Sequence, residues 1–288
     1  MEFHQLRYFC AVAETGSFSR AAERCQIAQP SLSQQVLKLE EDLGAKLFDR
    51  LGRSVRLTEA GRAFLPHARS ILEQMETARS SVAQKNADVR GSVSLGVIPT
   101  ISPYLVPRYT ASFAKRFPDA RLRIVEDVTP VLIESLRELS IDIAILALPL
   151  RHKDLEVFPL KTEPLFAVLP KDHRLANAAS VSLKDLRGEP FVMLRDGHCF
   201  RDLSLATCAR ARITPNIAFE SGQFSSLFGM VAAGVGISLV PEMAVDRHAG
   251  CRYVRLSDAR ATRTVVAAVL RGRSFNHVQR AFLAGIQQ

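Results

Sequence analysis

The sequence lacks any apolar run long enough to cross a lipid bilayer. Its longest runs, such as residues 143–148, fall far short of the roughly 20 residues that a membrane-spanning helix needs. Residues 1–5 show no basic segment leading into an apolar one, so we expect no secretory signal peptide. These absences predict a cytoplasmic protein with no membrane partner.

Several motifs of enzymes and cofactor-binding proteins are also missing. The histidines have no metal-ligand spacing, and neither a Cys-x-x-Cys pair nor a G-x-S-x-G elbow occurs. Gly234 and Gly236 follow a predicted helix, and no third glycine completes a dinucleotide motif, so we interpret them as a helix end and a turn. We therefore expect no metal and no cofactor.

Cysteine is scarce, with five in 288 residues, and two of them stand out. Cys199 is flanked by His198 and is followed by Arg201, and a cation near a thiol favours the reactive thiolate. If residues 200–208 form one helix, Cys199 and Cys208 are about 13 Å apart along its axis, whereas a disulfide needs Cα atoms about 4.4–6.8 Å apart. The pair can bridge only if that helix unwinds. The alternative is two unrelated buried thiols.

Positive charge is in excess, with a net charge of +9. Such an excess favours a polyanionic partner. The first ninety residues hold 13 Lys and Arg against 11 Asp and Glu. Net charge alone therefore does not locate a DNA-binding surface.

The first sixty residues have the pattern of a winged helix-turn-helix. One predicted helix ends at Gly16, Ser17 caps a second, and Pro30 suits the first position of a third. The third helix is expected to bury Leu32, Val36, Leu39 and Leu43, which recur at helical spacing. Its polar side chains suit base edges and phosphates, although a solvated face is the usual explanation for such residues. These candidates are Gln29, Pro30, Ser31, Ser33, Gln34, Gln35 and Lys38.

A wing and a long helix are predicted to follow. Residues 47–57 read as two short strands about a Gly turn, with Arg50, Arg53 and Arg56 available for phosphate or the minor groove. Thr58 can cap the long helix. Its apolar seam steps by four and three and, lacking an obvious intramolecular partner, predicts a homodimer. The seam is Phe64, Ala68, Ile71, Met75, Ala78 and Val82.

This half of the chain resembles the LysR-type transcriptional regulators. The matching runs are FSRAA at 18–22, QPSLS at 29–33, LEEDLG at 39–44, LFDR at 47–50 and LTEAG at 57–61. The resemblance implies a DNA-binding domain over 1–58 with a recognition region at about 18–37, and a linker helix over 59–90. It also implies two partners, double-stranded promoter DNA and RNA polymerase. Ala28 departs from the usual Ser or Thr and removes a cap hydroxyl.

Residues 91–288 alternate predicted strands and helices, which indicates an α/β domain of mostly parallel sheets. Two lobes fit the length, one over about 91–163 and 268–288, the other over about 164–267. This is the layout of a periplasmic-binding-protein-like regulatory domain. The loop at 99–102 lies at the carboxyl end of the first strand, where such domains bind ligands.

Four runs in this half resemble the peroxide-sensing OxyR group of the same family: IPTISPYLVP at 98–107, ILAL at 145–148, LRDGHC at 194–199 and MVAAGVGI at 230–237. The run GQFSS at 222–226 and the additional Cys251 depart from the pattern. The resemblance implies that peroxide oxidises Cys199 to a sulfenic acid, which Cys208 resolves as a disulfide. It places Thr100, Thr129, His198 and Asp202 around the peroxide, and we expect Arg201 beside them. We hypothesise that Cys199 is a partial thiolate held near His198 and Arg201.

The function expected from these observations is a homodimeric or homotetrameric regulator that senses hydrogen peroxide, controls oxidative-stress genes and is reset by a cytosolic thiol reductant. Two alternatives stay open. A LysR-type regulator could bind a small organic effector between the lobes, with Cys199 incidental. A thiol peroxidase would use the same thiols, but it has no use for residues 1–60. Cys10 and Cys25 are interpreted as packing residues.

Overall fold

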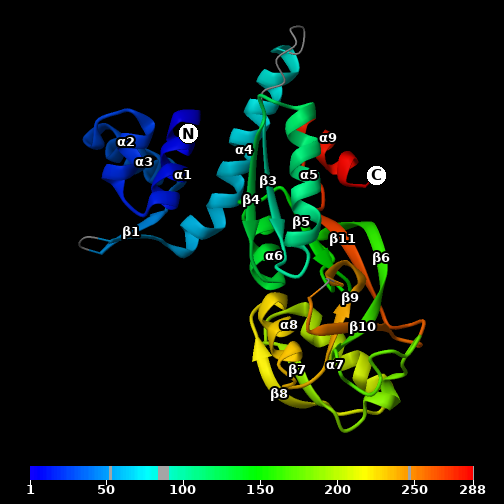
Figure 1. Ribbon diagram of the computed structural model, residues 1–288. Coiled ribbons are helices and arrows are strands. Elements are labelled where there is room, and N and C mark those ends of the chain that lie inside the picture. The colour runs from blue at the N-terminus through cyan, green and yellow to red at the C-terminus, as the bar shows by residue number, and fades with distance from the viewer. Residues whose placement is uncertain (52–53, 84–90, 246–247, 288) are drawn as a thin grey trace. The chain divides into compact units, whose positions relative to one another are not determined.

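The computed structural model describes residues 1–51, 54–83, 91–245 and 248–287 (Figure 1). The chain divides into two compact units, one largely residues 1–89 and the other largely residues 90–288. The first unit contains α1 (Phe3–Thr15), α2 (Phe18–Cys25), α3 (Gln29–Leu43), β1 (Phe48–Leu51), β2 (Ser54–Leu57) and α4 (Glu59–Ala83). This is the predicted order of three helices, a two-stranded wing and a long helix.

Local sequence signals fix the ends of these helices. Gly16 closes α1 with φ at 61°, a left-handed conformation that glycine adopts without strain. The Ser17 hydroxyl accepts the Arg20 N–H at 3.5 Å and so caps α2. Pro30 lies at the second position of α3, one residue later than predicted, because Ala28 is the cap. Leu43 was expected to be buried but is 38% exposed.

Aromatic rings join α1, the wing and α4 in the core of the first unit. Phe9 on α1 is fully buried, and its ring centroid lies 5.3 Å from those of both Phe48 on the wing and Phe64 on α4. Ala68 is also fully buried in this cluster, against which Ile71 packs. The first half of the predicted seam is therefore covered within the chain, and the premise that the long helix has nothing to pack against is wrong for that half.

A buried carboxylate fixes the wing to α3. Glu40 Oε1 accepts the backbone N–H groups of Leu47 at 2.7 Å and Phe48 at 3.1 Å, and the side chain is almost entirely enclosed. A carboxylate that accepts two buried N–H groups anchors the start of β1.

We expect Glu40→Ala to lower the free energy of unfolding by about 2–4 kcal/mol, because two buried donors lose their acceptor. Chemical denaturation of the full-length protein measures this loss. Glu41→Ala is the matched control, since Glu41 is exposed, and it should change the free energy of unfolding by less than about 0.5 kcal/mol. Equal effects of the two variants would contradict the anchoring role.

The second unit is a mixed α/β domain. Its helices are α5 (Ser102–Arg116), α6 (Thr129–Arg137), α7 (Cys199–Arg210), α8 (Phe224–Ala232) and α9 (His277–Ile286), with short turns η1 (Leu183–Leu186) and η2 (Glu242–Ala244). Its strands are β3 (Ser92–Val97), β4 (Arg121–Glu126), β5 (Ile143–Ala147), β6 (Leu155–Pro170), β7 (Pro190–Leu194), β8 (Asn216–Ser221), β9 (Ser238–Pro241), β10 (Cys251–Arg255) and β11 (Thr262–Leu270).

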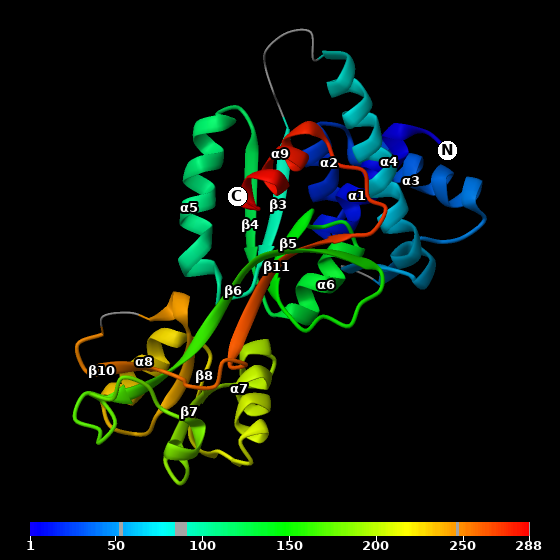
Figure 2. The ribbon, with the colours of Figure 1, turned by 90° about the vertical axis from the view of Figure 1, so that its right-hand side faces the viewer.

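The strand pairing corrects one prediction. Parallel pairing occurs at β4–β3–β5 in one lobe and at β7–β8 in the other, as expected. The seven-stranded sheet, however, also holds β9, β10, β6, β11 and β5 in antiparallel pairs, so it is mixed rather than mostly parallel. The cause is β6, which runs for 16 residues through the predicted crossover near Glu163, with β11 returning beside it. Figure 2 shows this strand pair passing from the β3–β5 lobe toward the lobe of β7, β8 and α7.

Among the described residues, no helix combines the length and apolar character needed to span a membrane. In the same part of the chain, no group of three or more His, Cys, Asp or Glu side chains is arranged to hold a metal ion.

Candidate functional site

Helix α7 carries both singled-out cysteines. Cys199 is its first residue and Cys208 lies in its last turn, and both are free thiols. Nine residues of continuous helix separate the two Cα atoms by about 13 Å of rise. The predicted helix is confirmed, so the two thiols cannot bond to each other without the loss of helical structure between them.

Burial, a hydroxyl and a nearby cation act on the Cys199 thiol, and burial, which raises its pKa, has the largest effect. The Thr129 hydroxyl, at the start of α6, and the charge of Arg263, on β11, both lower the pKa of the thiol, whereas Asp202 raises it. Burial outweighs these effects, and the pKa of Cys199 is raised from its ordinary value. This direction disfavours the partial thiolate that we hypothesised from the sequence.

Thr129 presents an available polar atom at this place. Apart from its interaction with the Cys199 thiol, its buried Oγ1 has no hydrogen-bond partner among the residues that the structure describes. Such a hydroxyl keeps hydrogen-bonding capacity for a further polar group.

Arg201 does not face the thiol, contrary to expectation. Its guanidinium donates to the Leu194 carbonyl at 2.8 Å, pairs with Asp196 at 2.7 Å and also binds Glu220. It therefore ties the start of α7 to the ends of β7 and β8. The cation beside Cys199 is Arg263, which comes from a strand 64 positions further along the chain.

Arg263 is the most enclosed cation of the site, with a side chain 1% exposed. Its Nε and Nη2 donate to Glu163 Oε1 at 3.0 and 2.7 Å. Its Nη1 lies 3.3 Å from Thr100 Oγ1 and 3.4 Å from the Thr100 carbonyl. Thr100 is itself buried in the loop between β3 and α5. Arg263 on β11 therefore binds Thr100 and acts on the Cys199 thiol of α7, which also interacts with Thr129 of α6.

The other predicted pocket residues have different surroundings. His198 is buried at the cap position of α7, where burial and the charge of Arg195 lower its pKa. Asp202 is exposed in the first turn and acts on the thiol only through its charge. Cys208 is fully buried, and burial raises the pKa of its thiol to about 11.

The predicted DNA-contacting side chains lie on the open side of α3. Gln29, Pro30, Ser31, Gln34 and Lys38 are exposed, and Ser33 is half-buried. Gln35 differs from expectation, because its Oε1 accepts Gln5 Nε2 at 3.1 Å and also contacts His4 Nε2, both on α1.

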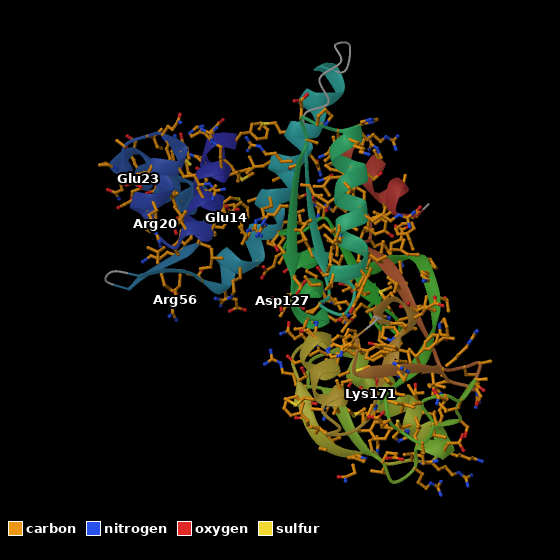
Figure 3. All side chains as sticks on the ribbon, viewed as in Figure 1. Glu14, Arg20, Glu23, Arg56, Asp127 and Lys171 are labelled. Carbon is orange, nitrogen blue, oxygen red and sulfur yellow. The ribbon has the colours of Figure 1, made fainter. Side chains whose placement is uncertain are left out.

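The wing supplies further cations. Figure 3 shows Arg56 on β2 and Arg20 on α2, and both side chains are exposed. Arg50 lies on β1, whereas Arg53 lies outside the described residues.

Sequence reasoning missed Arg263, Glu163 and the ring of Phe200 that packs beside them. One signal was available. Arg263 lies within β11, two residues before its apolar run, and Glu163 lies within β6 near its apolar end. Charges in buried strands need partners, and this opposite-charge pair could have been matched on that ground.

Two family models match the chain. The bacterial regulatory helix-turn-helix protein, lysR family, matches residues 3–62, and the LysR substrate binding domain matches residues 86–288. A curated relative from Pectobacterium carotovorum subsp. carotovorum, a hydrogen peroxide-inducible genes activator, is 36% identical over 248 residues, which are 86% of this chain and 82% of the relative.

The chain is also similar to solved structures of OxyR proteins. A full-length cysteine-to-aspartate variant of OxyR from Pseudomonas aeruginosa superposes with a TM-score of 0.84 at 33% identity, covering 100% of this chain and 94% of that one. A cysteine-to-serine variant of Corynebacterium glutamicum OxyR with hydrogen peroxide bound has a TM-score of 0.63 at 30% identity, covering 99% and 91%.

Proposed function

The chain belongs to the LysR family of bacterial transcriptional regulators, and we propose that it is a member that senses hydrogen peroxide through Cys199 and Cys208. One observation carries the proposal. Both thiols lie on α7, and the first of them faces a buried hydroxyl and a cation. The peroxide-related names of its relatives support the same conclusion.

The proposed oxidation uses the groups around Cys199. The sulfur attacks one oxygen of the peroxide, an S–O bond forms, and the O–O bond breaks. The departing oxygen takes up the thiol proton and leaves as water, so Cys199 becomes a sulfenic acid. The hydroxyls of Thr129 and Thr100 would hold the peroxide, and Arg263 would stabilise the negative charge on sulfur as the thiol deprotonates.

The second step transmits the signal. The Cys208 sulfur attacks the sulfenic sulfur, an S–S bond forms, and the S–O bond breaks. The departing hydroxyl takes up the Cys208 thiol proton and leaves as a second water. Because α7 separates the Cα atoms of the two cysteines by about 13 Å of rise, this step requires the helix to unwind. The disulfide would then hold the unwound segment, which is a two-state element biased by a covalent change.

The remaining partners follow from this assignment. The exposed side of α3 would contact promoter DNA, and the full regulator would be a homodimer or homotetramer whose half-sites lie about one helical turn apart. Oxidation by one peroxide per site and reset by a thiol reductant describe a switch, not an enzyme. We also propose a cytoplasmic location and contact with RNA polymerase, as promoter regulation requires.

Peroxide titration of the reduced protein on its promoter tests the function. We expect the footprint to change as a 199–208 disulfide appears in peptide mass spectrometry. An unchanged footprint with full disulfide formation would favour a small organic effector instead. Sustained peroxide turnover with a reductant, and no promoter binding, would favour a peroxidase.

The need to unwind α7 makes a further prediction. Ala206 is exposed within the helix, so Ala206→Gly lowers helix stability by about 1 kcal/mol. We expect disulfide closure after peroxide addition to become about fivefold faster, as timed by acid quenching and mass spectrometry. Ala209→Gly is the control, because Ala209 is also exposed but lies beyond Cys208. Equal closure rates in the two variants would argue that α7 does not unwind between the cysteines.

A further inference from the structure

A buried ion pair lies next to the sensing thiol, and no step of the proposed oxidation uses its acidic member. Glu163 is fully enclosed, and its two oxygens have separate partners. Oε1 accepts two N–H groups of Arg263, whereas Oε2 accepts the Met243 backbone N–H at 2.8 Å. The carboxylate is therefore tied both to the cation on β11 and to η2, which follows β9.

The opposite side of Arg263 contacts the sensing elements. Nη1 reaches Thr100, and the guanidinium carbon lies 5.5 Å from the ring centroid of Phe200, the residue next to Cys199. Glu163 lies directly opposite Arg263 in the register of β6 and β11. Its position is thus fixed by backbone pairing, and it in turn fixes where the guanidinium lies relative to α7.

The charge of the pair has a consequence for Cys199. An isolated cation in a dry environment acts strongly on a nearby thiol. A Glu163 carboxylate oxygen lies 2.7 Å from the same guanidinium, and its negative charge opposes the field of Arg263. The Cys199 thiol is therefore near an ion pair with little net charge rather than near a full positive charge. Burial raises the pKa of Cys199, and the Arg263 charge lowers it; a carboxylate paired with Arg263 weakens that lowering.

We propose that Glu163 is a positioning residue that holds Arg263 against Thr100 and Phe200 and restrains the reactivity of Cys199 by neutralising the charge of Arg263. The inference rests on the proposed function, in which Cys199 is the sensing thiol. The proposal predicts that the Cys199 thiol reacts more slowly than it would beside an unpaired Arg263. If the Glu163–Arg263 pair were purely structural, its loss would lower the stability of the protein and leave the reactivity of the Cys199 thiol unchanged.

The test is the pH dependence of Cys199 alkylation by iodoacetamide in the reduced full-length protein, read on the Cys199 peptide by mass spectrometry. We expect Glu163→Gln to lower the midpoint by about one pH unit, which gives about tenfold faster alkylation at neutral pH. Arg263→Gln should raise the midpoint, and the double variant should behave like Arg263→Gln. Glu156→Gln is the matched control, since Glu156 is exposed on the same strand.

An unchanged or raised midpoint in Glu163→Gln, accompanied by a lower melting temperature, would overturn the proposal. If Glu163→Gln does not fold, Glu163→Asp keeps the charge but moves it away from Arg263. It should lower the midpoint by less, and an unchanged midpoint there would equally overturn the proposal. No peroxide enters these measurements. A failure of Cys199 to respond to peroxide would therefore refute the proposed function separately.

Discussion

Cys199→Ser is expected to bind promoter DNA identically with and without hydrogen peroxide. Serine keeps the size and position of the side chain at the start of α7, but its hydroxyl is not oxidised by peroxide, so neither the sulfenic acid nor the disulfide can form. The reduced footprint should persist at every peroxide concentration. Footprinting of both proteins on the same promoter, before and after peroxide, measures this complete loss of response.

Two further variants separate the steps. Cys208→Ser should still form the sulfenic acid at Cys199, which a dimedone label traps, but it cannot close the bond that holds α7 unwound. Cys251→Ser is the control, because Cys251 is buried on β10 and contacts the Phe228 carbonyl instead. A footprint that changes with peroxide in Cys199→Ser as it does in the wild type would refute the redox mechanism.

Much of the fold could be predicted because its signals are local. Gly16, Ser17 and Thr58 mark helix ends through their own backbone and hydroxyl chemistry, and the structure has all three in those roles. Apolar spacing likewise located α3 and its buried face. Sheet pairing was harder to predict. β6 runs from Leu155 to Pro170 across the predicted lobe boundary at 163–164, and no local periodicity indicated that one strand would pass through both lobes.

Only those residues of the candidate site that lie close together in the sequence could be predicted. Cys199 and Cys208 share one helix, so their separation followed from spacing alone. Arg201 was chosen as the cation because it is near in sequence, yet its guanidinium binds Asp196 and Glu220. Arg263 reaches the thiol only through the return of β11 beside β6, and such a long-range contact is not encoded in any local pattern.

Gln34→Ala is expected to weaken promoter binding by about 10- to 100-fold, the effect of losing a good contact to a base edge. Gln34 is exposed on α3, and an exposed glutamine on a recognition helix can bind a base by donating through its amide NH2 and accepting through its amide oxygen. Lys38→Ala should instead weaken binding to all sequences alike and reduce the salt dependence of log K by about one. Fluorescence anisotropy with specific and scrambled duplexes at several salt concentrations distinguishes the two effects.

The neighbouring glutamine is the matched control. Gln35 is bound to Gln5 and His4 on α1, so Gln35→Ala should lower the melting temperature and leave promoter affinity within about twofold of wild type. Gln34→Ala should show the reverse, unaltered melting with lost affinity. If the two variants lose affinity equally and in proportion to their loss of stability, α3 contributes to DNA binding only through folding. The base contacts would then have to come from other parts of the first unit, such as the wing that carries Arg56.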